Sequence, residues 1–134
     1  MNKPQQELIQ YRLGRARESL EEARLLAANS HWNTCINRLY YACFYAVNAL
    51  LLTKGLSSAR HAGVRALFNQ HFVKQGAVSK ELAACYNDLF ESRQETDYED
   101  LFQFDSKAVP PLVEQAKSFV KAISRLIEES RTEF

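Results

Sequence analysis

The chain has 134 residues, a length that supports one hydrophobic core of ordinary size but hardly two. Apolar residues make up 46% of it and charged residues 25%, a balance that is typical of folded globular proteins and excludes a disordered chain. Because 17 Lys and Arg stand against 16 Asp and Glu, overall charge does not drive the protein onto nucleic acid or an anionic membrane, and such binding would need a local patch. We therefore expect a single domain over residues 1–134.

Two features of the sequence bear on its location. The longest apolar stretch, residues 39–52, is shorter than the roughly 20 residues that cross a bilayer, and the first seven residues are polar where a secretory signal has an apolar core. The three cysteines, Cys35, Cys43 and Cys85, lie in apolar helical patterns without the paired spacing of a zinc site. These features predict a cytoplasmic protein with buried free thiols and no membrane anchor.

The first predicted helix lies between Pro4 and Ser30, where apolar residues recur at steps of three and four and so share one helix face. These residues are Ile9, Leu13, Ala16, Leu20, Ala23 and Ala27. So narrow a seam suits either antiparallel packing inside a bundle or an interface between subunits, and spacing alone does not choose between them.

The second predicted helix, from His31 to about Thr53, carries apolar residues on more than one face, which predicts that it is the most buried helix. These residues are Trp32, Ile36, Leu39, Tyr40, Cys43, Phe44, Val47, Leu50 and Leu51. Lys54 and Gly55 then favour a helix end, because glycine readily takes the left-handed conformation that follows a helix.

A third helix is expected from a cap at Ser57 or Ser58, through Phe72, to about Gly76. A fourth is expected over residues 79–96, with Ser79 at its start. Together with the helix described next, these elements predict an all-α fold, an up-and-down bundle of about five helices.

Residues 97–105 (DYEDLFQFD) interleave acids with aromatic residues and break the helical pattern, so they read as a structured loop. Asp105 or Ser106 can cap the last helix, expected over residues 107–129. The pair Pro110-Pro111 fits only in the first turn of that helix, where missing amide donors cost little.

Most common kinds of active site find no support. The three histidines form no His-x-x-x-His or Glu-x-x-His spacing, and the four glycines form no phosphate-binding loop. His61 and Arg65 share a helix face, whereas Arg65 and His71 point about 120° apart on a continuous helix. We expect no metal and no other cofactor.

One polar cluster lies at the expected end of the fourth helix, where Arg93, Asp97 and Tyr98 follow one another closely. Arg93 and Asp97 are four residues apart, so they can form an ion pair that fastens the helix end. Alternatively, Arg93 and Tyr98 contact a phosphate and a base at a surface shared with a partner.

A second cluster lies in the second helix, where Arg38, Tyr41 and Tyr45 fall along one strip. The simpler interpretation is that these are core aromatics whose polar tips find partners. The alternative is a buried polar network in which Arg38 and the hydroxyls position Arg93, adding Arg38 and Tyr41 to a nucleotide- or RNA-binding site.

At these clusters the chain resembles the HEPN superfamily. The resembling segments are residues 38–46 (RLYYACFYA), 61–65 (HAGVR) and 93–98 (RQETDY), which together span most of the chain. The resemblance implies an up-and-down helical bundle, frequent homodimers, and pairing with a minimal nucleotidyltransferase protein in two-gene modules of the toxin–antitoxin kind.

Many HEPN proteins are metal-independent ribonucleases that use an arginine followed, four to six residues later, by a histidine. Here no histidine follows Arg93, and Asp97-Tyr98 occupies that region. An ionised aspartate cannot donate a proton to a leaving oxygen, so we expect a component that binds a nucleotidyltransferase and RNA or nucleotide. The alternatives are a dimeric toxin ribonuclease, in which a crowded Asp97 with a raised pKa acts as the acid beside Arg93, and a purely structural adaptor.

Overall fold

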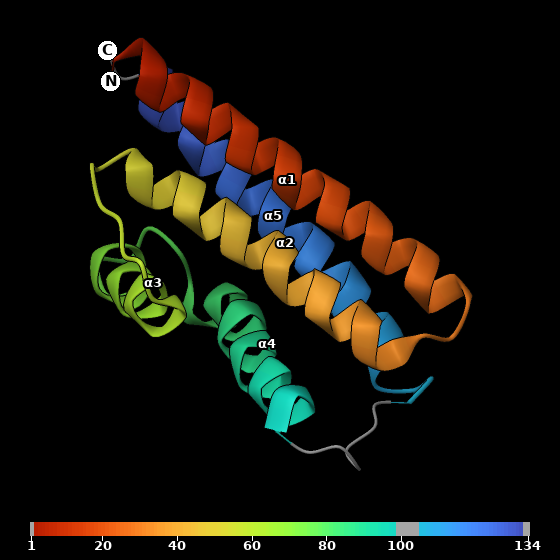
Figure 1. Cartoon of the computed structure of the whole chain (residues 1–134). Helices are drawn as coiled ribbons and strands as arrows, with labels where there is room; N and C mark the ends of the chain where they lie inside the picture. The colour runs from red at the N-terminus through yellow and green to blue at the C-terminus, as the bar shows by residue number, and fades with distance from the viewer. Residues whose placement is uncertain (1, 99–104, 133–134) are drawn as a thin grey trace.

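The computed structural model describes the backbone of residues 2–98 and 105–132 and the side chains of residues 2–92 and 105–131. Within these ranges the fold is all-α, as predicted, and has five α-helices (Figure 1). They are α1 (Lys3–Ala28), α2 (Trp32–Leu52), α3 (His61–Phe68), α4 (Lys80–Tyr98) and α5 (Val109–Thr132), with a π-helical turn, η1 (Asn69–Val73), directly after α3.

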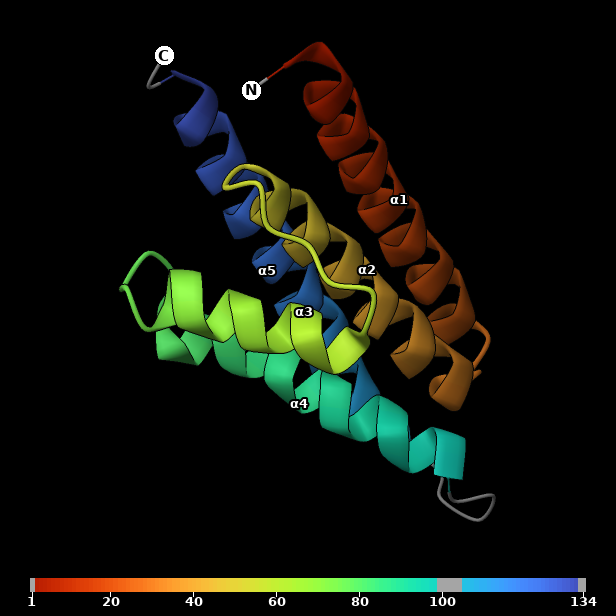
Figure 2. The same ribbon diagram turned by 60° about the vertical axis from the view of Figure 1, so that its left-hand side comes forward.

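The bundle is arranged around α2, which contacts each of the other four α-helices. Figure 1 shows α1, α2 and α5 side by side as three long rods, with α3 and α4 on the other side of α2. Both ends of the chain lie at the same end of these rods (Figure 2). The prediction that the second helix is the centre of the bundle is confirmed.

The core explains why α2 is so apolar. Along α2 the buried residues occupy nearly every turn, and they meet apolar residues from all the other helices. In the described ranges α2 is the one helix whose length and composition would also suit a membrane span, and 67% of the relevant window is buried inside the bundle. Such burial is expected of the central helix of a bundle.

The first helix starts with a capping box that the sequence analysis did not identify. Asn2 Oδ1 accepts a hydrogen bond from the Gln5 amide at 2.9 Å, and Gln5 Oε1 accepts one from the Asn2 amide at 3.3 Å. These bonds satisfy two amides that a helix start leaves without partners. The apolar seam predicted for this helix faces the core, since Ile9, Leu13 and Ala16 are buried there.

The start of α3 differs from the prediction. Neither Ser57 nor Ser58 caps the helix, which begins at His61; instead Ser58 Oγ accepts a hydrogen bond from the Arg60 amide in the preceding turn. The turn packs so closely on the helix that a Cβ at Gly63 would lie 2.1 Å from Ser58 Oγ. A larger residue at this position would therefore require Ser58 to move.

The expected continuous third helix is also wrong in its geometry, because the chain widens into the π-helical turn at Asn69–Val73. Phe68, before this turn, and Phe72, within it, are both buried in the core. The expected chain reversals at Gly55 and Gly76 are confirmed, with φ angles of 69° and 87°.

Ser79 caps α4 as the sequence predicts, whereas Asp105 caps the turn that leads into α5, which begins two residues after its expected start at 107. Ser79 Oγ accepts from the Leu82 amide at 3.1 Å, and Asp105 Oδ1 accepts from the Lys107 and Ala108 amides at 3.0 and 2.9 Å. The Pro110-Pro111 pair lies in the first turn of α5. The fourth helix runs to Tyr98, two residues past its expected end, and the rest of the expected loop up to residue 104 lies outside the described residues.

The three cysteines are free and buried, as expected. Cys35 Sγ donates a hydrogen bond to the Ala23 carbonyl at 3.3 Å and so joins α2 to α1. Burial raises the pKa of this thiol from 9.0 to about 11, because an apolar interior disfavours the thiolate.

Candidate functional site

One side of α2 does not enter the core completely. Arg38, Tyr41 and Tyr45 follow one another at steps of three and four, so they lie along one strip of the helix, and all three are only half-buried. The Arg38 guanidinium lies over the Tyr41 ring at 4.9 Å from its centroid, and Arg15 of α1 lies over the Tyr45 ring at 5.3 Å. Two cation–π pairs therefore lie side by side where α1 and α2 meet.

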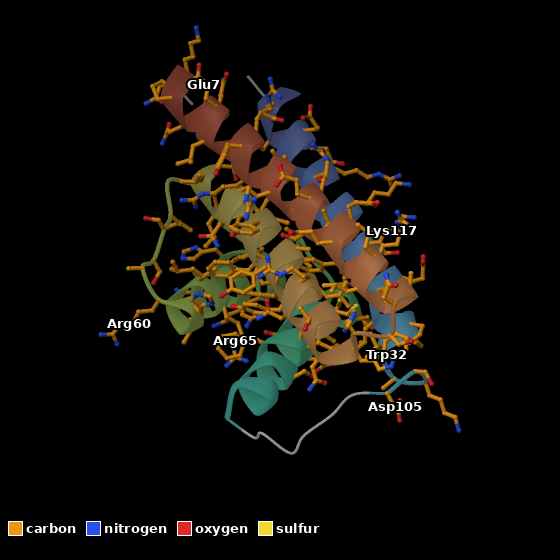
Figure 3. The ribbon with its side chains drawn as sticks, turned by 45° about the vertical axis from the view of Figure 1, so that its right-hand side comes forward. Glu7, Trp32, Arg60, Arg65, Asp105 and Lys117 are labelled. Atoms are coloured by element: carbon orange, nitrogen blue, oxygen red, sulfur yellow. The ribbon has the colours of Figure 1, made fainter. Side chains whose placement is uncertain are left out.

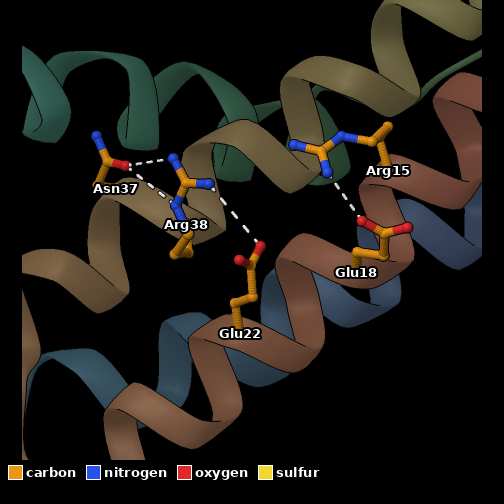
Figure 4. A network of polar contacts seen from close by, with 5 residues as sticks. All are labelled: Arg15, Glu18, Glu22, Asn37 and Arg38. Carbon is orange, nitrogen blue, oxygen red and sulfur yellow. Dashed lines mark hydrogen bonds and ion pairs between the residues drawn. The ribbon is translucent and has the colours of Figure 1, made fainter.

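Both arginines are held in place by acceptors (Figure 4). Arg38 donates from Nε and Nη2 to Asn37 Oδ1 at 3.2 and 2.7 Å, and its Nη1 lies 3.8 Å from a carboxylate oxygen of Glu22. Arg15 pairs with Glu18 at 2.8 Å. The contact with Tyr45, more than that with Glu18, raises the pKa of Arg15.

His61 connects this strip to α3. Its ring stacks on Phe44 with 4.2 Å between centroids, and its Nδ1 shares a hydrogen bond of 2.7 Å with the hydroxyl of Tyr40, which is fully buried. The Tyr41 ring meets His61 edge to face at 5.9 Å. The imidazole is thus fixed at the border between the core and the half-exposed strip.

Arg65 lies one turn after His61 on the same face of α3, as the sequence predicts. Its guanidinium lies 3.9 Å from the centroid of Phe90, and its Nη1 donates to Glu91 at 2.9 Å, so it joins α3 to α4. Figure 3 shows Arg65 at the junction of these helices, whereas Arg60 points away from the bundle.

We call the half-buried residues of this strip, together with the arginines and the histidine described above, the arginine–aromatic surface. It consists of Arg15, Arg38, Tyr41, Tyr45, His61 and Arg65. Guanidinium groups bind phosphate by charge and by paired N–H donors, and aromatic rings provide faces on which bases stack. The surface combines both kinds of group. In the described ranges no three His, Cys, Asp or Glu side chains are placed to hold a metal ion.

Of the residues predicted for a site, the structure brings Arg38 and Tyr41 into direct contact. Tyr41 and Tyr45 are half-buried and pack against the core, and both interpretations of the second cluster stay predictions. Arg93, Asp97 and Tyr98 lie in the last two turns of α4, and their side chains lie outside the described residues. The predicted Arg93–Asp97 pair and the positioning of Arg93 by Arg38 stay predictions.

Sequence reasoning did not single out Arg15, one of several arginines in the first helix. Nothing in the local pattern distinguishes Arg15 from Arg12 or Arg17. The pairing of α1 with α2 selects it, because that pairing brings Tyr45 beneath its guanidinium. His61 and Arg65 were recognised as sharing a face, but their aromatic partners come from other helices.

Comparison with known proteins gives a consistent result along almost the whole chain. The sequence pattern that defines the HEPN domain matches residues 9–132. A UPF0332 protein of Thermotoga maritima is 47% identical over 92% of this chain and 94% of its own length. A protein of Methanocaldococcus jannaschii that bears the name "Putative toxin MJ0605" is 31% identical over 96% of both chains.

A solved structure, that of ST0689, an archaeal HEPN homologue, has a similar fold. The two structures superpose with a TM-score of 0.59 over 93% of this chain and 96% of that one, with 15% sequence identity. At this identity the similarity concerns the fold alone, and it agrees with the helical bundle described above.

Proposed function

The chain belongs to the HEPN-domain family, and from that premise we propose that it is the HEPN component of a toxin–antitoxin-like module that binds RNA or nucleotide on its arginine–aromatic surface. The observation that carries the proposal is the pair of neighbouring contacts of Arg38 over Tyr41 and Arg15 over Tyr45. Single-stranded nucleic acid is bound by this combination of cations and ring faces elsewhere in proteins.

The ion pairs of the arginine–aromatic surface are weak enough for a phosphate to replace their glutamates. The side chains of Arg15, Arg38 and Arg65 are 34%, 25% and 29% exposed, and each is paired with a glutamate that is itself more than half exposed. Ion pairs this exposed are worth at most about 1 kcal/mol each. A phosphate, which carries more charge and more acceptors than a carboxylate, can therefore displace a glutamate at low cost.

The proposal extends to Arg93 and Tyr98 and to a protein partner. Both residues lie on α4, the helix to which Arg65 connects the arginine–aromatic surface through Phe90 and Glu91, so nucleic acid on that surface could continue onto them. The partner we propose is a minimal nucleotidyltransferase protein, with the HEPN chain acting as a homodimer. A role in a toxin-like module is supported by relatives of M. jannaschii whose names contain the word toxin.

The test is binding of a fluorescein-labelled single-stranded RNA of about 12 nucleotides, followed by anisotropy in chelator at two salt concentrations. We expect Arg38→Gln to weaken binding about tenfold and to reduce its salt dependence, because a cation that touches both phosphate and ring is lost. Arg17→Gln is the matched control, since Arg17 lies exposed on the α5 side of α1, beside a pocket that Lys117 also lines. Equal binding by wild type and Arg38→Gln would contradict the proposal.

A second candidate function is a dimeric ribonuclease that acts through Arg93 and Asp97, and the word toxin in the names of relatives favours it. Cleavage of the RNA can be measured in the same samples as binding. Cleavage of the RNA by the wild type but not by Arg93→Ala, with the solution mass unchanged, would support it. Binding without cleavage would favour the component that only binds. If the folded protein neither binds nor cleaves the RNA, the structural adaptor is the remaining interpretation.

A further inference from the structure

Two of the three cysteines come together between α2 and α4. Cys43 lies in the middle of α2 and Cys85 in the second turn of α4, and these two helices pack on each other. Close to them in sequence, Tyr40 and Tyr86 stack across the same interface, with 6.2 Å between ring centroids. The Cys43 thiol donates a hydrogen bond to the Cys85 sulfur. Two thiols from different helices are therefore direct neighbours.

The two thiols differ in their access to solvent. Cys43 has no exposed surface, whereas Cys85 is 7% exposed and lines a pocket of about 270 Å³ between α4 and α5. The other residues that line this pocket are Glu81, Leu82, Glu114, Gln115 and Ser118. A small molecule from solution therefore reaches the sulfur of Cys85 before that of Cys43.

The hydrogen bond between the thiols gives them different chemical roles. It lowers the pKa of Cys85, although burial and the nearby carboxylate of Asp88 act in the opposite direction. Burial, together with the same hydrogen bond, raises the pKa of Cys43 well above its usual value. Because the thiolate is the reactive form of cysteine, Cys85 is the nucleophile of the pair and Cys43 keeps its proton.

We propose that Cys85 is a site of oxidation by hydrogen peroxide and that Cys43 then forms a disulfide with it, which links α2 to α4. In the first step the Cys85 sulfur attacks one peroxide oxygen, and the O–O bond breaks. The sulfur becomes a sulfenic acid, and the leaving hydroxide forms water with the proton of the Cys85 thiol.

In the second step the Cys43 sulfur attacks the Cys85 sulfur. The S–S bond forms, the S–O bond breaks, and the hydroxide leaves as a second water with the proton of Cys43. Two thiols are thus oxidised to one disulfide while one hydrogen peroxide is reduced to two waters. Both reacting sulfurs are already neighbours in the reduced protein, so the second step needs no unfolding of the bundle.

The pocket favours a small, neutral oxidant. Glu81 and Glu114 place two carboxylates around Cys85, and carboxylates repel anions such as oxidised glutathione. Hydrogen peroxide carries no charge and is much smaller than the pocket. The pocket therefore admits the peroxide and disfavours exchange with an anionic disulfide.

This site is separate from the arginine–aromatic surface, to which neither cysteine belongs. The disulfide would close a long loop between residues 43 and 85, and such a link stabilises a fold by restricting its unfolded chain. Disulfides that form transiently in reducing compartments commonly serve redox sensing. The oxidised protein should therefore unfold at a higher urea concentration than the reduced protein.

The test counts free thiols after the reduced, folded protein has been treated with hydrogen peroxide. The protein is then denatured and alkylated with iodoacetamide, and its intact mass gives the number of alkyl groups. The reduced protein should carry one group on each of its three cysteines, and the oxidised protein should carry one group in total. Peptide mass mapping should find Cys43 joined to Cys85, and dithiothreitol should restore both thiols.

Single variants separate the roles of the cysteines. Cys85→Ala should keep both of its remaining thiols free, whereas Cys43→Ala should form a sulfenic acid at Cys85, which dimedone traps. Cys35→Ala is the matched control and should form the disulfide as the wild type does, because Cys35 has no exposed surface. Oxidised glutathione should leave the wild-type thiols free. Circular dichroism checks that each variant is folded.

Three free thiols in the folded wild type, under peroxide treatment that oxidises free cysteine in the same buffer, would overturn the proposal. A disulfide that involves Cys35 or joins two chains would also overturn it, as would an oxidised protein that unfolds at a lower urea concentration than the reduced one. RNA binding is measured on the reduced protein, so its outcome leaves this proposal unaffected.

Discussion

On one side of α2, Leu39, Cys43 and Val47 are completely buried, whereas on the neighbouring side Arg38, Tyr41 and Tyr45 remain in contact with solvent. Both sides are rich in large side chains, and both pack against other helices. On the buried side the partners are apolar, and on the other side they are arginines and a histidine. The first side serves stability, and the second is the one for which we propose binding.

The largest expected effect is on the buried side. Leu39→Ala should lower the free energy of unfolding by about 2–5 kcal/mol, because it removes buried apolar volume and leaves a cavity in the central helix. Urea unfolding followed by circular dichroism measures this. Once binding is corrected for the folded fraction, RNA affinity should stay within about twofold of the wild type. A stability loss below about 1 kcal/mol would mean that this side of α2 is not the core that the structure describes.

The buried thiol of Cys35 predicts a loss of stability in alkali. Because burial raises its pKa to about 11, the folded state keeps a proton that the unfolded state has lost above pH 9.0. Fewer protons bound by the unfolded state mean that stability falls as pH rises. The contribution of Cys35 is complete below pH 9 and is lost up to about pH 11, where the fall reaches about 2 kcal/mol.

The check is urea unfolding of wild type and Cys35→Ala at several pH values between 8 and 11. The variant should be less stable throughout, since it loses buried volume, but its further fall across this range should be smaller by about 2 kcal/mol. An identical fall in both proteins would show that Cys35 does not titrate in this way.

The smallest expected effect is at the border between the two sides. Tyr40→Phe removes the hydrogen bond to His61 Nδ1 but keeps the buried ring, so unfolding should become easier by about 1 kcal/mol. Because His61 then loses its anchor while keeping its stacking on Phe44, RNA binding should fall by a few-fold only. Tyr11→Phe is the matched control, since it removes a hydroxyl from an exposed ring outside the arginine–aromatic surface. If Tyr40→Phe changes neither the free energy of unfolding nor RNA affinity, the Tyr40–His61 hydrogen bond does not connect the buried side of α2 with the arginine–aromatic surface.

Much of the site was predictable from residues within α2. Arg38 and Tyr41 are three positions apart, so a helix brings them together whatever else the chain does. His61 and Arg65 are four apart and share a face for the same reason. The contacts that complete the surface join residues 30 and 21 positions apart, as in Arg15 with Tyr45 and Tyr40 with His61, and these follow from helix packing that local pattern does not encode.

The sequence by itself determined the five α-helices, the central place of α2 and several of the ends, because apolar periodicity and capping residues act over a few neighbouring positions. Only the tertiary structure decided the break at Asn69–Val73 and the close approach of Gly63 to Ser58, which depend on how α3 and the preceding turn pack. It also decided that the apolar seam of α1 packs inside the bundle, a choice between bundle and subunit interface that spacing alone leaves open.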